Sequence, residues 1–117
     1  MEAINPFASL DSWSADRWSD GLQIQELDEL DAVTVRTRHS VYELIVLAGD
    51  AGHVLVRGGH YFPEFTPARL MGSSGCGTFL KRLGIYRGLQ LEFLVNRRRI
   101  VTSPVESVQI TPSGLPG

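Results

Sequence analysis

The residues best suited to chemistry are a glycine-rich stretch and the single cysteine inside it. Residues 72–78 (GSSGCGT) precede Lys81 and Arg82, and successive backbone N–H groups in such a stretch can cradle a phosphate. The spacing GxxxxGK[ST] of a phosphate-binding loop is absent, and no predicted parallel strand and helix flank the stretch. The composition therefore predicts a flexible connecting loop.

Cys76 and the histidines are the next candidates, as a nucleophile with its base or as metal ligands. No spacing in the sequence ties Cys76 to His39, His53 or His60. The same residues lack the close pairs that structural zinc sites use. We therefore predict that the protein is not an enzyme and holds no metal or cofactor.

Arginines form a better candidate for binding, because the guanidinium group presents a planar fork of donors that suits phosphate and carboxylate. Two of them share one face of a predicted strand, one ends the next strand, and three occupy a predicted hairpin tip. The predicted binding residues are Arg36, Arg38, Arg57, Arg97, Arg98 and Arg99, joined by Trp13 and Trp18 near the N-terminus.

Charge divides the chain into two parts. Residues 1–31 contain eight acidic residues and one arginine, a net charge of −7, whereas residues 32–117 contain ten basic and five acidic residues, a net charge of +5. Such an asymmetry concerns association rather than fold. Both tryptophans lie in the acidic segment, which is unusual for a disordered tail. We expect Trp13 and Trp18 to pack back onto the body or to dock on another chain.

These features predict a small interaction module for a protein partner or for a second copy of the chain. The alternative is a regulatory domain that binds nucleic acid or a phosphorylated small ligand through an arginine-rich face. An isoelectric point near 5.9 and the lack of aromatic residues between the arginines weigh against nucleic acid.

Length and cysteine content set the expected class and compartment. The 117 residues fit one domain, and one cysteine excludes an intramolecular disulfide. The N-terminus lacks the basic and apolar regions of a signal peptide. The longest apolar run, residues 44–48, is far shorter than the roughly 20 residues of a membrane-spanning helix. We expect a cytoplasmic protein that does not span a membrane.

Alternating hydrophobicity begins at Ala32 and predicts a three-stranded meander. Residues 32–37 alternate with period two, as in a half-buried strand. Residues 41–47 (VYELIVL) are apolar on both faces, which predicts a strand that is covered on two sides. Residues 49–52 contain the glycines of a tight hairpin, and residues 53–57 return as a third strand.

The second half is less regular. Pro63 and Pro67 interrupt residues 60–72, for which we predict an irregular loop that leads into a short strand. Residues 89–95 alternate cleanly, so Leu91 and Phe93 should face the core.

The intervening Glu92 should then face solvent, because successive side chains of a strand point to opposite faces. Asn96, Arg97 and Arg98 should turn the chain into a second hairpin. Pro104 should mark a sheet edge or a bulge.

Short strands joined by tight turns predict an all-β protein, a small antiparallel SH3-like barrel or roll of five to six strands. The barrel should occupy residues 32–110, preceded by a non-barrel N-terminal arm, residues 1–31, and followed by a frayed tail, residues 111–117. The alternative is a five-stranded oligonucleotide-binding barrel, which normally carries a helix that this sequence does not predict.

A succession of short motifs runs from Thr37 onward: SVYEL after Thr37, VLVRGG, FPE, ARL, GS, GIY, LEF and the ending RIVTSPV with Ser107. In these motifs the chain resembles a group of short, uncharacterised bacterial proteins. The resemblance spans about two thirds of the chain, supports a compact domain and implies no catalytic residue.

Overall fold

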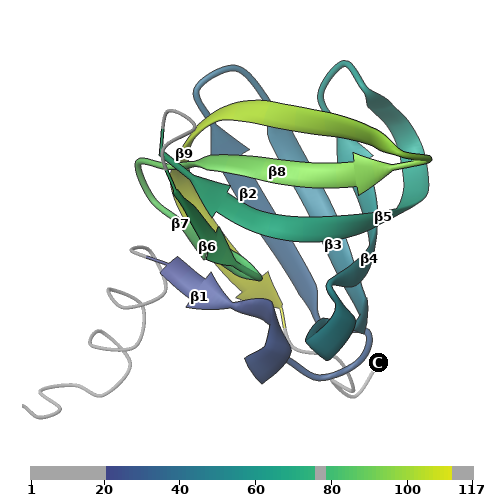
Figure 1. Cartoon of the computed structure of the whole chain (residues 1–117). Helices are drawn as coiled ribbons and strands as arrows, with labels where there is room; N and C mark the ends of the chain where they lie inside the picture. Colours follow the sequence, from purple (N-terminus) through teal and green to yellow (C-terminus); the bar gives the residue numbers. More distant parts are fainter. Residues whose placement is uncertain (1–20, 76–78, 112–117) are drawn as a thin grey trace, which may run out of the picture.

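The computed structural model describes residues 21–75 and 79–111, which form an antiparallel β-barrel (Figure 1). Two short 3-10 turns, η1 (Ile24–Glu26) and η2 (Gly49–Ala51), lie between strands. The strands are β1 (Gly21–Gln23), β2 (Ala32–Thr37), β3 (Val41–Ala48), β4 (His53–Gly58), β5 (Phe62–Ser74), β6 (Leu80–Arg82), β7 (Gly84–Tyr86), β8 (Gln90–Val95) and β9 (Arg98–Thr111).

Six strands close the barrel in the order β2, β3, β4, β5, β8 and β9, and β9 pairs back with β2. Every pairing in this ring is antiparallel. β6 pairs with β5 outside the ring, and β1 pairs separately with β7. Closure gives each strand of the ring a partner on both sides over at least part of its length, which shortens the exposed edges of an open sheet. The predicted all-β class and small antiparallel barrel are therefore confirmed.

The period-two pattern of the first strands places alternate side chains inside the barrel. In β2, Val33 and Val35 are fully buried, and in β3 the inner residues are Tyr42, Leu44 and Val46. The outer residues of β3 are exposed or half-buried, so the prediction that this strand is covered on both sides is wrong. A barrel strand has one inner face, and nothing among the described residues covers the other.

Most of residues 60–72, predicted to be an irregular loop because of their prolines, belong to the long strand β5. This long strand pairs with β4 through its first half and with β8 only from Arg69 onward. Pro63 and Pro67 both precede Arg69, so they lie where β5 has a partner on one side only. A proline lacks the N–H donor, and this costs no ladder hydrogen bond on an unpaired side.

The segment before Ala32 contributes to the core. Leu22 of β1 and Ile24 of η1 are buried, and the Ile24 amide donates to the Leu83 carbonyl at 2.9 Å. Backbone bonds also join Leu30 and Asp31 to Val46 of β3. The packed core therefore extends upstream of the predicted boundary at residue 32. Trp13 and Trp18 lie outside the described residues.

Three aromatic rings fill the centre of the barrel. The ring centroids of Phe62 and Phe93 are 5.5 Å apart at an edge-to-face angle, and Tyr42 lies 6.4 Å from each of them. Edge-to-face pairs add to the stability that burial of the rings already provides. Leu91 and Phe93 are fully buried, as predicted from the alternation in β8.

Replacing Phe93 by alanine should lower the free energy of unfolding by about 3 to 5 kcal/mol, because it removes a fully buried ring and leaves a cavity. Val101 on β9 is 38% exposed, so Val101→Ala should cost less than about 1 kcal/mol. Urea unfolding of both variants measures the two values. Equal losses would contradict the assignment of Phe93 to the core.

Candidate functional site

Arg36, near the end of β2, and Arg38, just after it, line a hollow of about 210 Å³ together with His39 and Glu106. Both arginines are exposed, and neither makes an ion pair with another residue of the described ranges 21–75 and 79–111. The sequence predicted that these two share a strand face; Arg38 instead lies just after β2, beyond a bulge between Arg36 and Thr37, and the two side chains line the same hollow.

A hydroxyl network holds the turn between β2 and β3 in place. The Thr37 hydroxyl donates to the Ser40 carbonyl at 3.1 Å, and the Ser103 hydroxyl donates to Thr37 Oγ1 at 2.9 Å. Tyr42 hydrogen-bonds to the Ser40 side chain, and burial raises the pKa of its phenol. In Figure 1 this turn and the β4–β5 turn lie at the same end of the barrel, the top.

Two of the predicted binding arginines are engaged within the barrel wall. Arg57 Nε donates to Glu43 Oε1 at 2.9 Å, and the guanidinium lies 4.3 Å from the centroid of the Phe65 ring. Arg99 donates from Nε and Nη2 to the two carboxylate oxygens of Glu92, at 2.8 and 3.0 Å. Each pair joins opposite charges on adjacent strands, so these guanidiniums already have ligands.

Glu92 does not face solvent as predicted, because its side chain is only 9% exposed. It lies between the buried Leu91 and Phe93, on the outer face of β8, where Arg99 and the hydrogen-bonding Ser74 cover it. The hydrogen bonds from Arg99 lower the pKa of the Glu92 carboxyl below its ordinary value, and partial burial opposes them. Glu92 is thus a structural ion-pair partner.

Arg97 and Arg98 lie at the tip of the β8–β9 hairpin. Val95 pairs with Arg98, which leaves Asn96 and Arg97 as a two-residue turn with φ of 48° and 69°. Such turns favour asparagine followed by glycine, so Arg97 occupies a position where a side chain is strained.

The six arginines therefore do not form one face. The Arg38 amide donates to the Pro104 carbonyl, whereas Arg98 lies six residues earlier on β9, which is on the order of 20 Å along a strand. With Arg57 and Arg99 paired, the arginines separate into a pair at the β2 end and a pair at the hairpin tip.

An apolar row on the outer face of the barrel was missed by the sequence analysis. Ile45, Leu55 and Pro67 lie directly opposite one another on β3, β4 and β5. Leu47, which is 36% exposed, and Leu94 extend the row along the wall. Its sequence signal is the second apolar face of residues 41–47, which lies on the outer surface of the barrel and is not covered as predicted.

The row borders a shallow hollow of about 260 Å³, lined by Leu47, His53, Val54, Pro67, Ala68, Arg69 and Leu94. Leu47 also borders a second hollow of about 300 Å³, whose lining includes Asp28, Glu29 and Asp50. An apolar centre with a charged rim is the arrangement found in protein interfaces. We call Ile45, Leu47, Leu55, Pro67 and Leu94 the outer apolar row.

Other candidates from the sequence contribute little within the described residues. Gly72–Ser74 belongs to β5, with Ser73 and Ser74 buried, and Cys76 lies outside the described residues. In residues 21–75 and 79–111, no three His, Cys, Asp or Glu side chains come close enough to hold a metal ion. Over the same residues, no helix has the length and apolar composition needed to cross a membrane.

Comparison of the chain with protein-family models, with curated proteins and with solved structures found no match. The resemblance to a group of short bacterial proteins therefore stays a prediction.

The Glu92–Arg99 pair makes stability depend on pH. Glu92→Gln should lower the free energy of unfolding near pH 7, and the loss should shrink in acid. A carboxyl with a lowered folded-state pKa stabilises the fold above its unfolded-state pKa, and this contribution disappears as the pH falls through the folded-state pKa. Urea unfolding at about pH 7, 4.5 and 3 measures the difference from the unmodified protein.

Glu64→Gln is the matched control, since Glu64 is exposed and the variant loses the same charge. A stability difference for Glu92→Gln that stays constant, or grows, between about pH 7 and 3 would contradict this role of the pair.

Proposed function

We propose that this protein is a non-enzymatic interaction module whose outer apolar row binds a protein partner. The observation that carries the proposal is the direct alignment of Ile45, Leu55 and Pro67 across three strands on the outer surface of the barrel. Contiguous apolar surface on the outside of a small protein is a common mark of an interaction site.

Strand geometry makes this surface suitable for a partner. The barrel interior already contains its own aromatic and aliphatic side chains, so the outer row is not needed to fill the core. Regular strands hold its members in fixed positions, which lowers the entropy that a partner must overcome to bind. Charged residues border the outer apolar row on both sides, Arg69 on one and Asp50 on the other, and they can fix the orientation of a bound partner.

A second copy of the chain is one form that the partner can take in this proposal. Two barrels that meet through their outer rows would bury apolar side chains from both copies, as in the packing of two sheets face to face. The SH3-like character, the bacterial origin and the cytoplasmic setting belong to the same proposal. They are supported by the small barrel, by the resemblance of the sequence and by the single cysteine.

Replacing Leu47 and Leu55 together by serine should weaken partner binding at least about tenfold, which corresponds to about 1.4 kcal/mol. The full-length protein, tagged and expressed in its native host, is compared with the variant by quantitative co-purification. Sedimentation equilibrium of the same two proteins reports self-association.

The matched control replaces Tyr61 and Val101 by serine. Both are exposed, at 57% and 38%, and neither borders any of the hollows described above. Circular dichroism verifies that both variants fold. If the two double variants lose partner binding equally, or neither loses it, the outer row is not the binding surface.

The second candidate function is binding of nucleic acid or a phosphorylated small ligand at the β2 end. It is favoured by one observation: Arg36 and Arg38 line the same hollow and have no ion-pair partner among the described residues. Glu106 in the same lining weakens the attraction for phosphate.

A labelled single-stranded oligonucleotide tests this alternative. Phosphate contacts release counterions, so binding should weaken steeply as salt rises and should be lost in Arg36→Gln/Arg38→Gln. Fluorescence anisotropy measures both effects. Binding that is absent in low salt, or unchanged by these substitutions, would exclude the arginine pair as a nucleic-acid site.

A further inference from the structure

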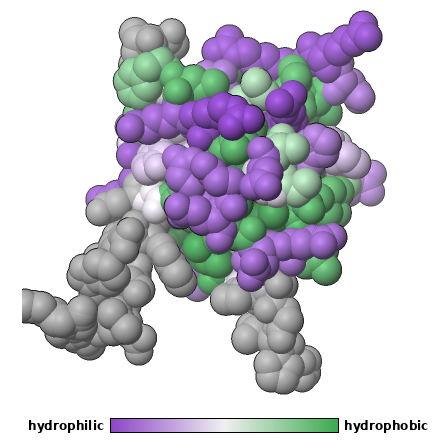
Figure 2. Space-filling model, turned by 60° about the horizontal axis from the view of Figure 1, so that its bottom comes forward, coloured by the Kyte–Doolittle hydropathy of each residue, from purple (hydrophilic) through white to green (hydrophobic). Residues whose placement is uncertain are grey.

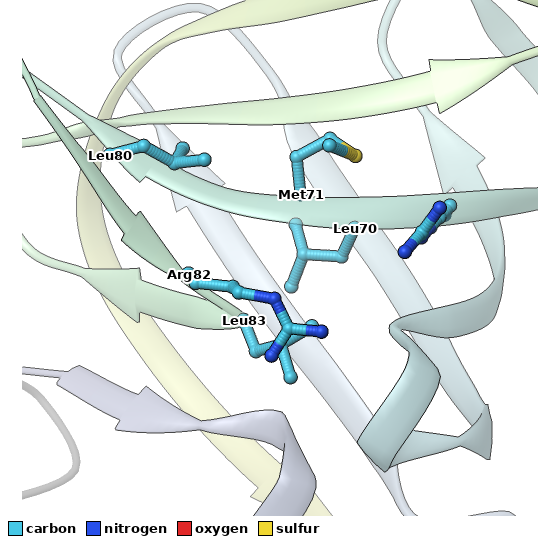
Figure 3. Close-up of a pocket in the computed structure, with 6 residues that line it drawn as sticks. Leu70, Met71, Leu80, Arg82 and Leu83 are labelled. Atoms are coloured by element: carbon cyan, nitrogen blue, oxygen red, sulfur yellow. The ribbon is translucent and has the colours of Figure 1, made fainter.

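A fourth hollow, of about 60 Å³, lies beside β5 and β6 and combines apolar walls with two guanidinium groups (Figure 3). Its lining is Arg69, Leu70, Met71, Leu80, Arg82 and Leu83. Leu70 and Leu83 are buried in the barrel, whereas Leu80 is exposed. Figure 3 shows the Arg82 side chain extending across Leu83 alongside β5.

The two arginines of this hollow are available to a ligand. Arg69 Nε donates to the Ala51 carbonyl at 3.2 Å, which positions that guanidinium, and Arg69 makes no ion pair within residues 21–75 and 79–111. Arg82 has neither a side-chain hydrogen bond nor an ion pair within the same residues. Guanidinium pairs beside apolar walls suit a carboxylate that is carried next to a large apolar side chain.

A third cation, Lys81, lies on the β7 side of β6. Lys81, which adjoins Arg82 on β6, places its ammonium 5.3 Å from the centroid of the Tyr86 ring. Tyr86 in turn pairs with Gly21, the first described residue of β1. Gly21, where residues 1–20 join the barrel, is therefore on the β7 side, next to Tyr86 and Lys81. On the face seen in Figure 2, hydrophobic surface lies between strongly hydrophilic side chains.

The sequence that ends at Gly21 carries the matching chemistry. Residues 11–20 (DSWSADRWSD) contain three aspartates, Arg17 and both tryptophans of the protein. Trp18 is three residues from Gly21 and Trp13 is eight, so an extended chain carries them at most about 10 and 29 Å from that point. With three aspartates against Arg17, a net charge of −2, and with two tryptophans, the segment has negative charge and apolar side chains that complement the hollow.

We propose that residues 11–20 of the same chain dock on the Arg69–Arg82 hollow, with aspartate carboxylates on the guanidinium groups and a tryptophan against Leu80 and Met71. The site is a docking site for an acidic segment with aromatic residues, and the chain supplies its own ligand. Attachment at Gly21 keeps the segment at a high local concentration, which favours binding within one molecule. The proposal does not depend on the outer apolar row.

Tryptophan fluorescence of the full-length protein tests the docking, because Trp13 and Trp18 are its only tryptophans. The unmodified protein should show blue-shifted emission in low salt. Arg69→Gln/Arg82→Gln should shift the emission to the red and increase quenching by neutral acrylamide about twofold, since the rings lose their apolar contact. Arg97→Gln/Arg98→Gln removes the same charge at the hairpin tip and should change neither property.

A second variant leaves the barrel untouched. Asp11→Asn/Asp16→Asn/Asp20→Asn should reproduce the red shift, which excludes damage to β5 or β6 as its cause. Raising salt from about 0.01 to 1 M shortens the Debye length from roughly 30 to 3 Å, so the unmodified protein should shift partly to the red. The emission should not change on dilution, because the contact lies within one molecule.

Four results would overturn the proposal. They are water-exposed emission of the unmodified protein at low salt, no red shift in Arg69→Gln/Arg82→Gln, an equal red shift in the Arg97→Gln/Arg98→Gln control, and emission that reddens on dilution. The last result would assign the hollow to the segment of a second copy.

Discussion

Closure of the barrel by the pairing of β9 with β2 is the constraint on which the rest of the structure depends. To close a ring, β9 pairs with β8 through its first half and with β2 through its second, and β5 is shared between β4 and β8 in the same way. This sharing explains why these two strands are the longest, at 14 and 13 residues. Bulges at Arg36, Leu70 and Gln90 allow the strands to bend.

The local pattern of hydrophobic residues was enough to predict the strands that pair with the next strand along the chain. The meander of β2, β3 and β4 has clean alternation and tight turns, and Pro104 lies beside the bulge that it was expected to mark. β5 could not be predicted, because the cost of a proline depends on whether the strand has a partner on that side. Ile24 was missed for a similar reason, since its contacts come from residues distant in sequence, such as Leu83.

The candidate site was harder to predict than the fold, because the chemistry of a charged residue depends on its cross-strand neighbour. Glu43 lies opposite Arg57 and Glu92 lies close to Arg99 only in the observed register, and a shift by one residue would leave each arginine unpaired. The sequence identified the arginines by type but not by partner. The number of arginines in the sequence therefore overstates how much positive charge is open to a ligand.

Arg69 connects the two surfaces proposed for binding, since its side chain lines both the hollow beside the outer apolar row and the hollow shared with Arg82. A carboxylate on Arg69 neutralises a charge at the edge of the row, and a partner on the row changes the solvation of the same guanidinium. Any effect of one ligand on the affinity for the other must be equal in both directions, because binding free energies are linked. An acidic partner would therefore compete with residues 11–20 at Arg69, whereas an apolar partner would bind beside a neutralised arginine. The two proposals thus share a single side chain, Arg69, through which binding at one surface would affect binding at the other.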